Sequence, residues 1–302
     1  MTHLLALLLY NAAFLLWLRA LLAGGRTAGG GGGDHGSRRG GPTGEVWLPG
    51  LRPWAREAWG GDALPAWIAA AGVIFHIVAT ARFTTTFGEL PLVGLGPSLS
   101  MLALLTAVGL LGALAVREGE RVGILLLPLA IVLQATALAV GIRPSGADPD
   151  FRGGWFVLHA GLGLAGVVGI ALAGAAGWLY LAQFRELKAK RMGRLFHFLP
   201  PLTTLDRLGR VGARAGFVLL SLSLALGWAW TVRFRGTFGQ DQADMWWGLF
   251  SWFVLLGAIL SRTLGEGAPE RRAALANSLA FLLIAAGYVV LRLAGNANGG
   301  FL

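Results

Sequence analysis

Two histidines stand inside runs of apolar residues, where an ionisable side chain is costly to place. His76 lies in the run that begins at Leu64, and His159 follows Trp155 in "WFVLHAGLG". A neutral imidazole ring has one nitrogen with a free lone pair, which makes it a common ligand of transition metals and of haem iron. Two such rings at one depth in an apolar, partly dry setting would suit the axial positions of a haem. We therefore take His159 first, and His76 second, as candidate iron ligands.

A histidine in an apolar helix also has a simpler explanation, which is a hydrogen bond to a polar side chain on a neighbouring helix. Gln134, Asn11 and Asn277 are candidate partners, because each lies in another apolar run. Residue types alone leave both interpretations of His76 and His159 open. The remaining histidines stand at the start of the chain or in polar connectors, and we expect them to be solvated: His3, His35 and His197.

The composition of the chain indicates a membrane protein. Of its 302 residues, 55% are hydrophobic and only 13% are charged, and the mean hydropathy is +0.65. A soluble domain of this length would have about a quarter of its residues charged. The shortfall comes from apolar segments of about 20 residues, the length needed to cross a hydrocarbon core. The chain has no cysteine, which excludes disulfides, thiolate metal sites and thioether attachment of haem.

Eight apolar segments are long enough to cross the membrane, and we predict an all-α, polytopic transmembrane bundle. The predicted spans are 4–22, 64–81, 91–116, 122–141, 155–183, 215–232, 245–260 and 273–293. They divide the chain into a first transmembrane helix (1–23), a Gly-rich cytoplasmic linker with an amphipathic Trp/Arg segment (24–63) and a seven-helix membrane domain (64–302).

The distribution of Lys and Arg predicts the orientation of the bundle. The loops after spans one, three, five and seven hold 18 of the 25 Lys and Arg residues. Basic residues accumulate in cytoplasmic loops, so we expect these four loops to be cytoplasmic and both termini to face outward. This bias also accounts for the formal net charge of +10, and we expect no nucleic acid partner.

This orientation places both membrane histidines near the outer surface. His76 lies six residues before Arg82, which is about 9 Å at 1.5 Å per residue. His159 lies four residues after Trp155, which is about 6 Å at the same rise. The two imidazoles are therefore predicted at a similar depth in the outer half of the membrane.

Tryptophans are concentrated beside the loop that follows the sixth span. Five of the 12 tryptophans fall between positions 228 and 252, around "RFRGTFGQDQADM". Interfacial tryptophan belts are ordinary in membrane proteins, so a belt is one interpretation. The other is a binding surface, because flat aromatic rings beside arginines suit a planar apolar ligand with carboxylates. The candidate stacking residues are Trp246, Trp247 and Trp252, and the candidate partners of haem propionates are Arg233 and Arg235.

Small residues recur every four positions along the fifth span, and they predict its place in the bundle. The series is Gly161, Ala165, Gly169, Ala173 and Gly177. Small residues at this interval allow two helix backbones to approach closely. We therefore expect the fifth span to be central.

The order of these features resembles the cytochrome c assembly superfamily, and more narrowly its HemX- and YpjD-type members, which are relatives of CcsA. "WFVLHAGLGLAGVVGIALAGAAGWLYLAQFRELKAK" resembles the fifth helix of the family, and "LPPLTTLDRL" resembles its next connector. "WWGLFSWFVLLGAILSRTLGEGAPERRAA" is similar to the helix that follows the family's Trp-rich loop. The resemblance covers the chain from about residue 64 onward. It implies haem handling at the outer face of the bacterial inner membrane, with His159 at the family's histidine and His76 at one from an early helix.

The chain also departs from the family pattern. The family's Trp-Asp-Pro-Lys-Glu core has no good counterpart, since Gln242 stands where the Asp should be and Asp244 lies near the Lys position. Ser261 stands where a histidine would follow the seventh span. Together with the lack of a nucleophile–base pair or phosphate loop in the spans, this implies an accessory protein that binds haem without turnover.

Two other functions remain open at this point. One is a HemX-like regulatory or structural membrane protein that binds no cofactor and acts through its basic cytoplasmic loop. The other is a small-molecule transporter, whose broken helices could include the Gly/Pro-rich start of the third span. The expected partners are membrane lipid, haem, and proteins of cytochrome c biogenesis or tetrapyrrole synthesis.

Overall fold

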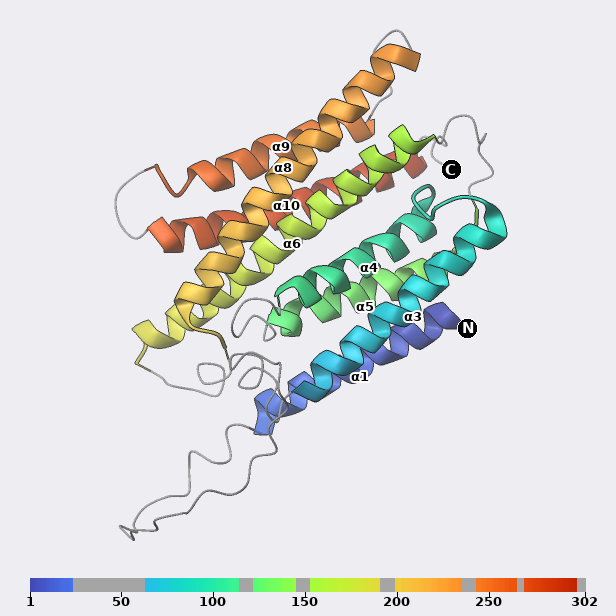
Figure 1. Ribbon diagram of the computed structural model, residues 1–302. Coiled ribbons are helices and arrows are strands. Elements are labelled where there is room, and N and C mark those ends of the chain that lie inside the picture. Colours follow the sequence, from blue (N-terminus) through green and yellow to red (C-terminus); the bar gives the residue numbers. More distant parts are fainter. Residues whose placement is uncertain are drawn as a thin grey trace, which may run out of the picture.

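The fold is all-helical in the part of the chain that the computed structural model describes, which is residues 1–23, 63–113, 122–144, 153–190, 199–234, 243–264 and 269–297. The helices in these ranges are α1 (Thr2–Ala23), α3 (Ala63–Phe87), α4 (Leu95–Ala113), α5 (Gly123–Val140), α6 (Gly154–Lys188), α8 (Leu202–Phe234), α9 (Ala243–Leu260) and α10 (Pro269–Ala297) (Figure 1). The predicted all-α fold is confirmed. The predicted linker lies outside the described residues, apart from Ala63, which begins α3.

Six of these helices are long and apolar enough to cross a membrane: α1, α3, α4, α5, α6 and α8. The protein is therefore a multi-pass membrane protein. Helix α9 has a shorter apolar stretch, Met245–Leu260. That α9 and α10 also cross the membrane, and that both termini face outward, remain predictions.

Several helices extend beyond their predicted spans, α8 by the largest number of residues. Helix α6 continues to Lys188, and α8 begins at Leu202, inside the basic connector. The 35 residues of α6 measure about 52 Å at 1.5 Å per residue, which exceeds the thickness of a hydrocarbon core. Leu, Arg, Lys and Glu are good helix formers in water, which accounts for the extension of α6. The start of α8 is stabilised by the buried side chains of Leu205 and Leu208.

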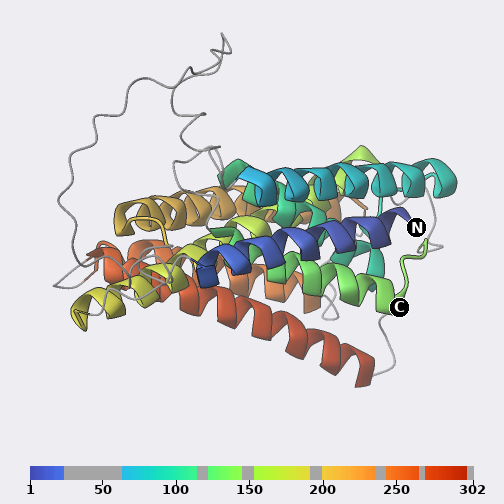
Figure 2. The ribbon, with the colours of Figure 1, turned by 90° about the horizontal axis from the view of Figure 1, so that it is seen from below.

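The helices form two groups of four (Figure 1). The first group holds α1, α3, α4 and α5, the second holds α6, α8, α9 and α10, and α6 contacts α4 and α5 across the boundary. Successive described helices run in opposite directions, so the start of α1 and the end of α10 lie at the same end of the bundle (Figures 1 and 2). We call this end, where α6 begins, the His159 end. The opposite end, where α8 begins, is the Asp206 end.

Glycine allows a close contact between the backbones of α6 and α8. A Cβ atom on Gly169 would lie 2.7 Å from the Gly216 Cα atom and 2.8 Å from the Gly212 carbonyl oxygen. About two turns later along α6, a Cβ atom on Gly177 would meet α10 at the Ser278 hydroxyl. Helix α6 thus packs against α8 and α10 and also reaches the first group. The predicted central position of the fifth span is confirmed.

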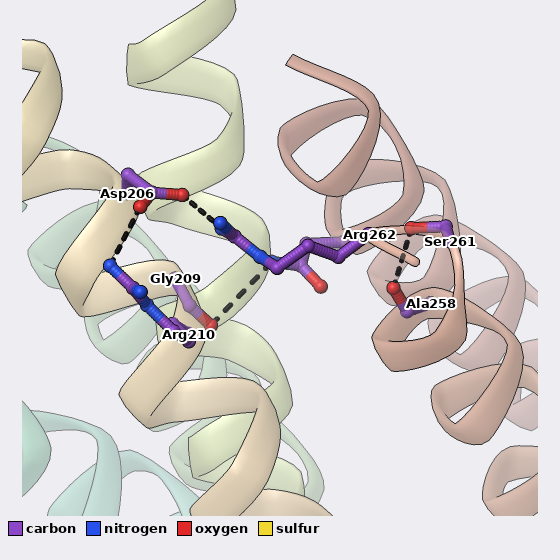
Figure 3. Close-up of polar contacts among 7 residues, drawn as sticks. Asp206, Gly209, Arg210, Ala258, Ser261 and Arg262 are labelled. Carbon is purple, nitrogen blue, oxygen red and sulfur yellow. Dashed lines mark hydrogen bonds and ion pairs between the residues drawn. The ribbon is translucent and has the colours of Figure 1, made fainter. Parts of the chain in front are cut away.

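An ion-pair cluster joins the helices at the Asp206 end (Figure 3). The Asp206 carboxylate accepts a hydrogen bond from Arg210 at 2.8 Å and another from Arg262, which lies in the turn after α9. Beside it, the Arg272 Nε atom of α10 donates to the Ser261 carbonyl oxygen at 3.3 Å. The Asp206 side chain is only 10% exposed, so the cluster connects α8 firmly to the end of α9.

We expect Asp206→Asn to lower the free energy of unfolding by about 2 kcal/mol, because hydrogen bonds to charged groups contribute more than neutral ones. Arg210→Gln is the matched control. It removes only an i,i+4 pair whose arginine side chain is 41% exposed, and such pairs contribute about 0.5 kcal/mol. Unfolding in detergent micelles, followed by circular dichroism, measures both variants. Equal losses from the two would contradict the assignment of the stronger interaction to Arg262.

Candidate functional site

His159 lies in the second turn of α6 and faces α8. Its Nδ1 atom is 2.8 Å from the backbone carbonyl oxygen of Ser223. A carbonyl oxygen can only accept a hydrogen bond, so Nδ1 must carry the proton. In the neutral ring the lone pair is then on Nε2, and among the described residues Nε2 has no hydrogen-bond partner.

Two residues of α8 fix the position of this ring. The buried Ser223 hydroxyl donates to the His159 carbonyl oxygen at 2.9 Å, so the two residues bind each other in both directions. Gly227 lies directly against the imidazole, because a Cβ atom there would come within 2.7 Å of the ring's Cε1 atom. One turn before His159, the Trp155 Nε1 atom donates to the Leu226 carbonyl oxygen at 3.1 Å. These contacts hold the ring in one position between α6 and α8. We call Trp155, Ser223, Leu226 and Gly227 the His159 cradle.

The same arrangement is found in histidines that bind a metal. Such histidines usually donate their other ring N–H to a carboxylate or a backbone carbonyl, which fixes the tautomer and the ring orientation. No group of three or more His, Cys, Asp or Glu side chains able to hold a metal ion occurs in the described ranges. The half-buried His159 thus suits a group that needs a single protein ligand, as haem iron does in several haem proteins.

His76 has a different environment. Its side chain is fully buried, with the Tyr10 hydroxyl 3.2 Å from Nδ1 and the Ser100 hydroxyl 2.9 Å from Nε2. Ser100 donates its only proton to the Gln134 Oε1 atom at 3.0 Å, so it must accept a hydrogen bond from the His76 Nε2–H group. Tyr10 then donates to Nδ1, and both ring nitrogens are occupied.

His3 joins the same cluster from the first turn of α1. Its Nδ1 atom lies 3.4 Å from the Gln134 Nε2 atom, and its ring meets the His76 ring edge-on with the centroids 5.5 Å apart. The prediction that His3 is solvated is wrong, because α1 packs along α3 and α5 and brings its first turn into the interior. We call His3, Tyr10, His76, Ser100 and Gln134 the His76 cluster.

The structure does not bring the two candidate ligands into one site. The partners of His76 come from α1 and α4, with Gln134 of α5 behind Ser100, whereas those of His159 come from α8. In the described part of the chain no hydrogen bond or ring contact joins His76 to His159. Of these two histidines, only His159 keeps a ring-nitrogen lone pair free of a hydrogen bond among the described residues.

The predicted stacking tryptophans also have separate contacts. The Trp247 Nε1 atom donates to the Ile284 carbonyl oxygen of α10 at 3.1 Å, and that of Trp252 donates to the Ser221 hydroxyl of α8 at 2.8 Å. Ser221 and Ser223 are two residues apart on a helix, which separates them by about 200° around its axis. Trp252 and His159 therefore contact different faces of α8, and the structure does not assemble these indoles around His159. Trp246 is exposed on α9.

The two candidate arginines follow this site in the sequence. Arg233 is exposed and lies six residues after Gly227, which is about 9 Å further along α8 at 1.5 Å per residue. Arg235 lies outside the described residues, as do His35 and His197. The residues that sequence reasoning missed are Ser223 and Gly227. Both belong to "SLSLALG", the one hydroxyl- and glycine-containing stretch in the middle of the sixth span.

A known protein family matches the part of the chain that forms this site. The model of the family described as cytochrome C assembly protein matches residues 94–297, which include the whole of α4 to α10 and therefore His159 and its cradle. A protein of Azospirillum brasilense, named "Uncharacterized 28.8 kDa protein in nifR3-like 5'region", is 29% identical over 176 residues. That match covers 57% of this chain and 64% of the relative. No solved structure matches the chain. Because the family model matches about two thirds of its length, the chain belongs to the cytochrome c assembly protein family.

Proposed function

We propose that the protein binds haem through His159, at the end of the bundle that faces the outside of the bacterial cytoplasmic membrane, as a HemX-like accessory of cytochrome c assembly. One observation carries the proposal. The Nδ1–H group of His159 is bound to the Ser223 carbonyl oxygen at 2.8 Å, which leaves the Nε2 lone pair for an iron atom.

The surroundings of His159 suit a planar, largely apolar group. Trp155 lies one turn before it and is 49% exposed, and Trp228, next to Gly227, is 59% exposed. Indole rings provide flat apolar area for a macrocycle, and a guanidinium binds a carboxylate well. We therefore propose that Arg233 and Arg235 would bind the propionates, and that exposed indoles such as Trp246 would add apolar contact.

Each residue of the cradle has a defined part in this proposal. When bound, haem would supply its redox-active iron. Ser223 holds the imidazole in the tautomer that can act as a ligand, and Gly227 leaves the space in which the ring lies. His159 is half-buried at this contact. We expect binding or carriage of haem rather than turnover.

His76 has a structural part in this proposal and is not the second axial ligand. Iron could bind either ring nitrogen only at the cost of the hydrogen bond to Tyr10 or to Ser100. A buried hydroxyl that loses its partner costs about 1 to 3 kcal/mol.

The haem content of purified protein tests this proposal. Protein from haem-replete cells is expected to show a Soret band, and His159→Ala is expected to reduce bound haem by at least about tenfold, as loss of a metal-site interaction commonly does. His3→Gln is the matched control, because it changes another histidine at the same end of the bundle and is expected to retain haem.

Two results would contradict the proposal. The first is an unchanged Soret band in a folded His159→Ala variant. The second is a colourless wild-type protein that also fails to take up added haem, which would favour the regulatory or structural alternative without a cofactor.

A further inference from the structure

One exposed face of α8 is basic near the start of the helix and apolar toward its middle. Arg207, Val211, Arg214, Val218 and Leu222 recur at intervals of three or four residues, so they form one continuous ridge on the helix. All five are exposed, with Val211, Val218 and Leu222 at 52%, 55% and 50%. The ridge is basic at the Asp206 end of the bundle and apolar toward the middle.

The spacing of the charges along α8 indicates where this ridge meets the membrane surface. The 18 residues between Arg214 and Arg233 include no charged residue. The distance from Arg214 to Arg233 is about 28 Å at 1.5 Å per residue, close to the thickness of a hydrocarbon core of about 30 Å. Arg214 therefore lies at the border of the hydrocarbon, and Arg207 lies about 10 Å further out, at the level of the lipid headgroups.

In the described ranges, the charges of these two arginines are not neutralised by an acidic side chain. Neither Arg207 nor Arg214 forms an ion pair in the ranges that the structure describes. The nearby Asp206 carboxylate is already bound by its two arginine partners. The connector 191–198, "RMGRLFHF", contains no Asp or Glu. The described part of the chain thus leaves both guanidinium groups able to bind an anion from outside.

We propose that Arg207 and Arg214 bind the phosphate-bearing headgroup of an anionic phospholipid, whose acyl chains lie along Val218 and Leu222. Guanidinium groups on either side of Val211 would donate charge-assisted hydrogen bonds to the phosphate oxygens. Basic clusters beside a transmembrane helix attract anionic lipids in this way. The apolar part of the ridge favours a lipid over free phosphate, because free phosphate gains nothing from Val218 and Leu222.

The test compares lipid binding by wild-type protein and Arg207→Gln/Arg214→Gln in detergent, by native mass spectrometry with added phosphatidylglycerol or phosphatidylcholine. The double variant is expected to bind phosphatidylglycerol about tenfold more weakly, since each basic residue near the surface contributes a several-fold attraction. Binding of phosphatidylcholine is expected to be unchanged. The matched control is Arg82→Gln/Arg143→Gln, which removes two exposed arginines at the opposite end of the bundle and is expected to bind like wild type.

Three results would overturn the inference. One is equal phosphatidylglycerol binding by the two double variants. Another is displacement of the bound phosphatidylglycerol by millimolar inorganic phosphate, which would identify a simple anion site. The third is a loss of self-association with unchanged lipid binding, which would show that a second copy of the chain covers the ridge. Because these arginines lie far from His159, haem content reports separately on the proposed function.

Discussion

Gly169→Ala is expected to lower the free energy of unfolding by about 2 kcal/mol, the usual cost of inserting a methyl group where the packing has no room. The added Cβ atom would lie 2.7 Å from the Gly216 backbone nitrogen and 2.8 Å from the Gly212 carbonyl oxygen. These neighbours are backbone atoms and cannot rotate away, so α6 and α8 would have to separate. The contact between these helices also forms the His159 cradle, and the same variant is expected to lose haem.

Gly161→Ala is the matched control for this prediction. Gly161 belongs to the same series of small residues on α6, but a Cβ atom there would meet no atom within 4 Å. Since alanine is a better helix former than glycine by about 1 kcal/mol, Gly161→Ala is expected to be neutral or slightly stabilising. The measurement is unfolding by sodium dodecyl sulfate in mixed micelles. A Gly169→Ala variant as stable as Gly161→Ala would show that the helices are not so closely packed.

His76→Ala is expected to lower the free energy of unfolding by about 3 kcal/mol, because it combines a cavity with unpaired buried hydroxyls. Tyr10 would lose its acceptor, and Ser100 would lose the Nε2–H donor. Gln134 and His3 lie behind Ser100, so the effect extends across all four helices of the first group.

Tyr10→Phe separates the hydrogen bond from the packing. It removes one hydroxyl from the cluster and leaves the aromatic ring, so the expected loss is about 1 kcal/mol. Thermal unfolding in detergent, followed by tryptophan fluorescence, compares the variants. The structural part assigned to His76 would be wrong if His76→Ala were as stable as wild type while haem content fell.

The helices were predictable from the sequence because the apolar runs have the length that a membrane demands. Their ends were not. Helix α8 begins at Leu202 rather than near Ala215, since Leu205 and Leu208 of this polar stretch are buried in the core and stabilise its first turns. Hydropathy detects the part of a helix that meets lipid and does not detect its continuation into water.

The chemistry of the site was predictable only in part. His159 could be selected from its depth and residue type, but its partners on α8 depend on how α6 and α8 are aligned against each other. The sequence carries that alignment only through Gly169, Gly212 and Gly216, and which small residues meet cannot be read from either helix alone. Ser223 and Gly227 therefore emerged only from the three-dimensional arrangement.

For Gln134 and the tryptophans, the sequence likewise indicated the residue types but not their contacts. Gln134 was among the hydrogen-bond partners suggested by residue type, and it does belong to the His76 cluster, although Ser100 makes the direct contact. The tryptophans are concentrated in the sequence, yet Trp247 and Trp252 each donate to a different helix. A buried indole N–H requires an acceptor, and this need directs each ring separately, whatever the local density of tryptophan.

The most direct test of the haem proposal is chemical rescue of a His159→Gly variant by free imidazole. This substitution leaves a space for imidazole beside the Ser223 carbonyl oxygen, where the added molecule can donate the same hydrogen bond and present its other nitrogen to iron. The expected result is a variant without a Soret band that regains a wild-type haem spectrum when millimolar imidazole and haem are added together. A His159→Gly variant that binds haem with the wild-type spectrum without imidazole, or that is folded but not rescued by it, would contradict His159 as the iron ligand.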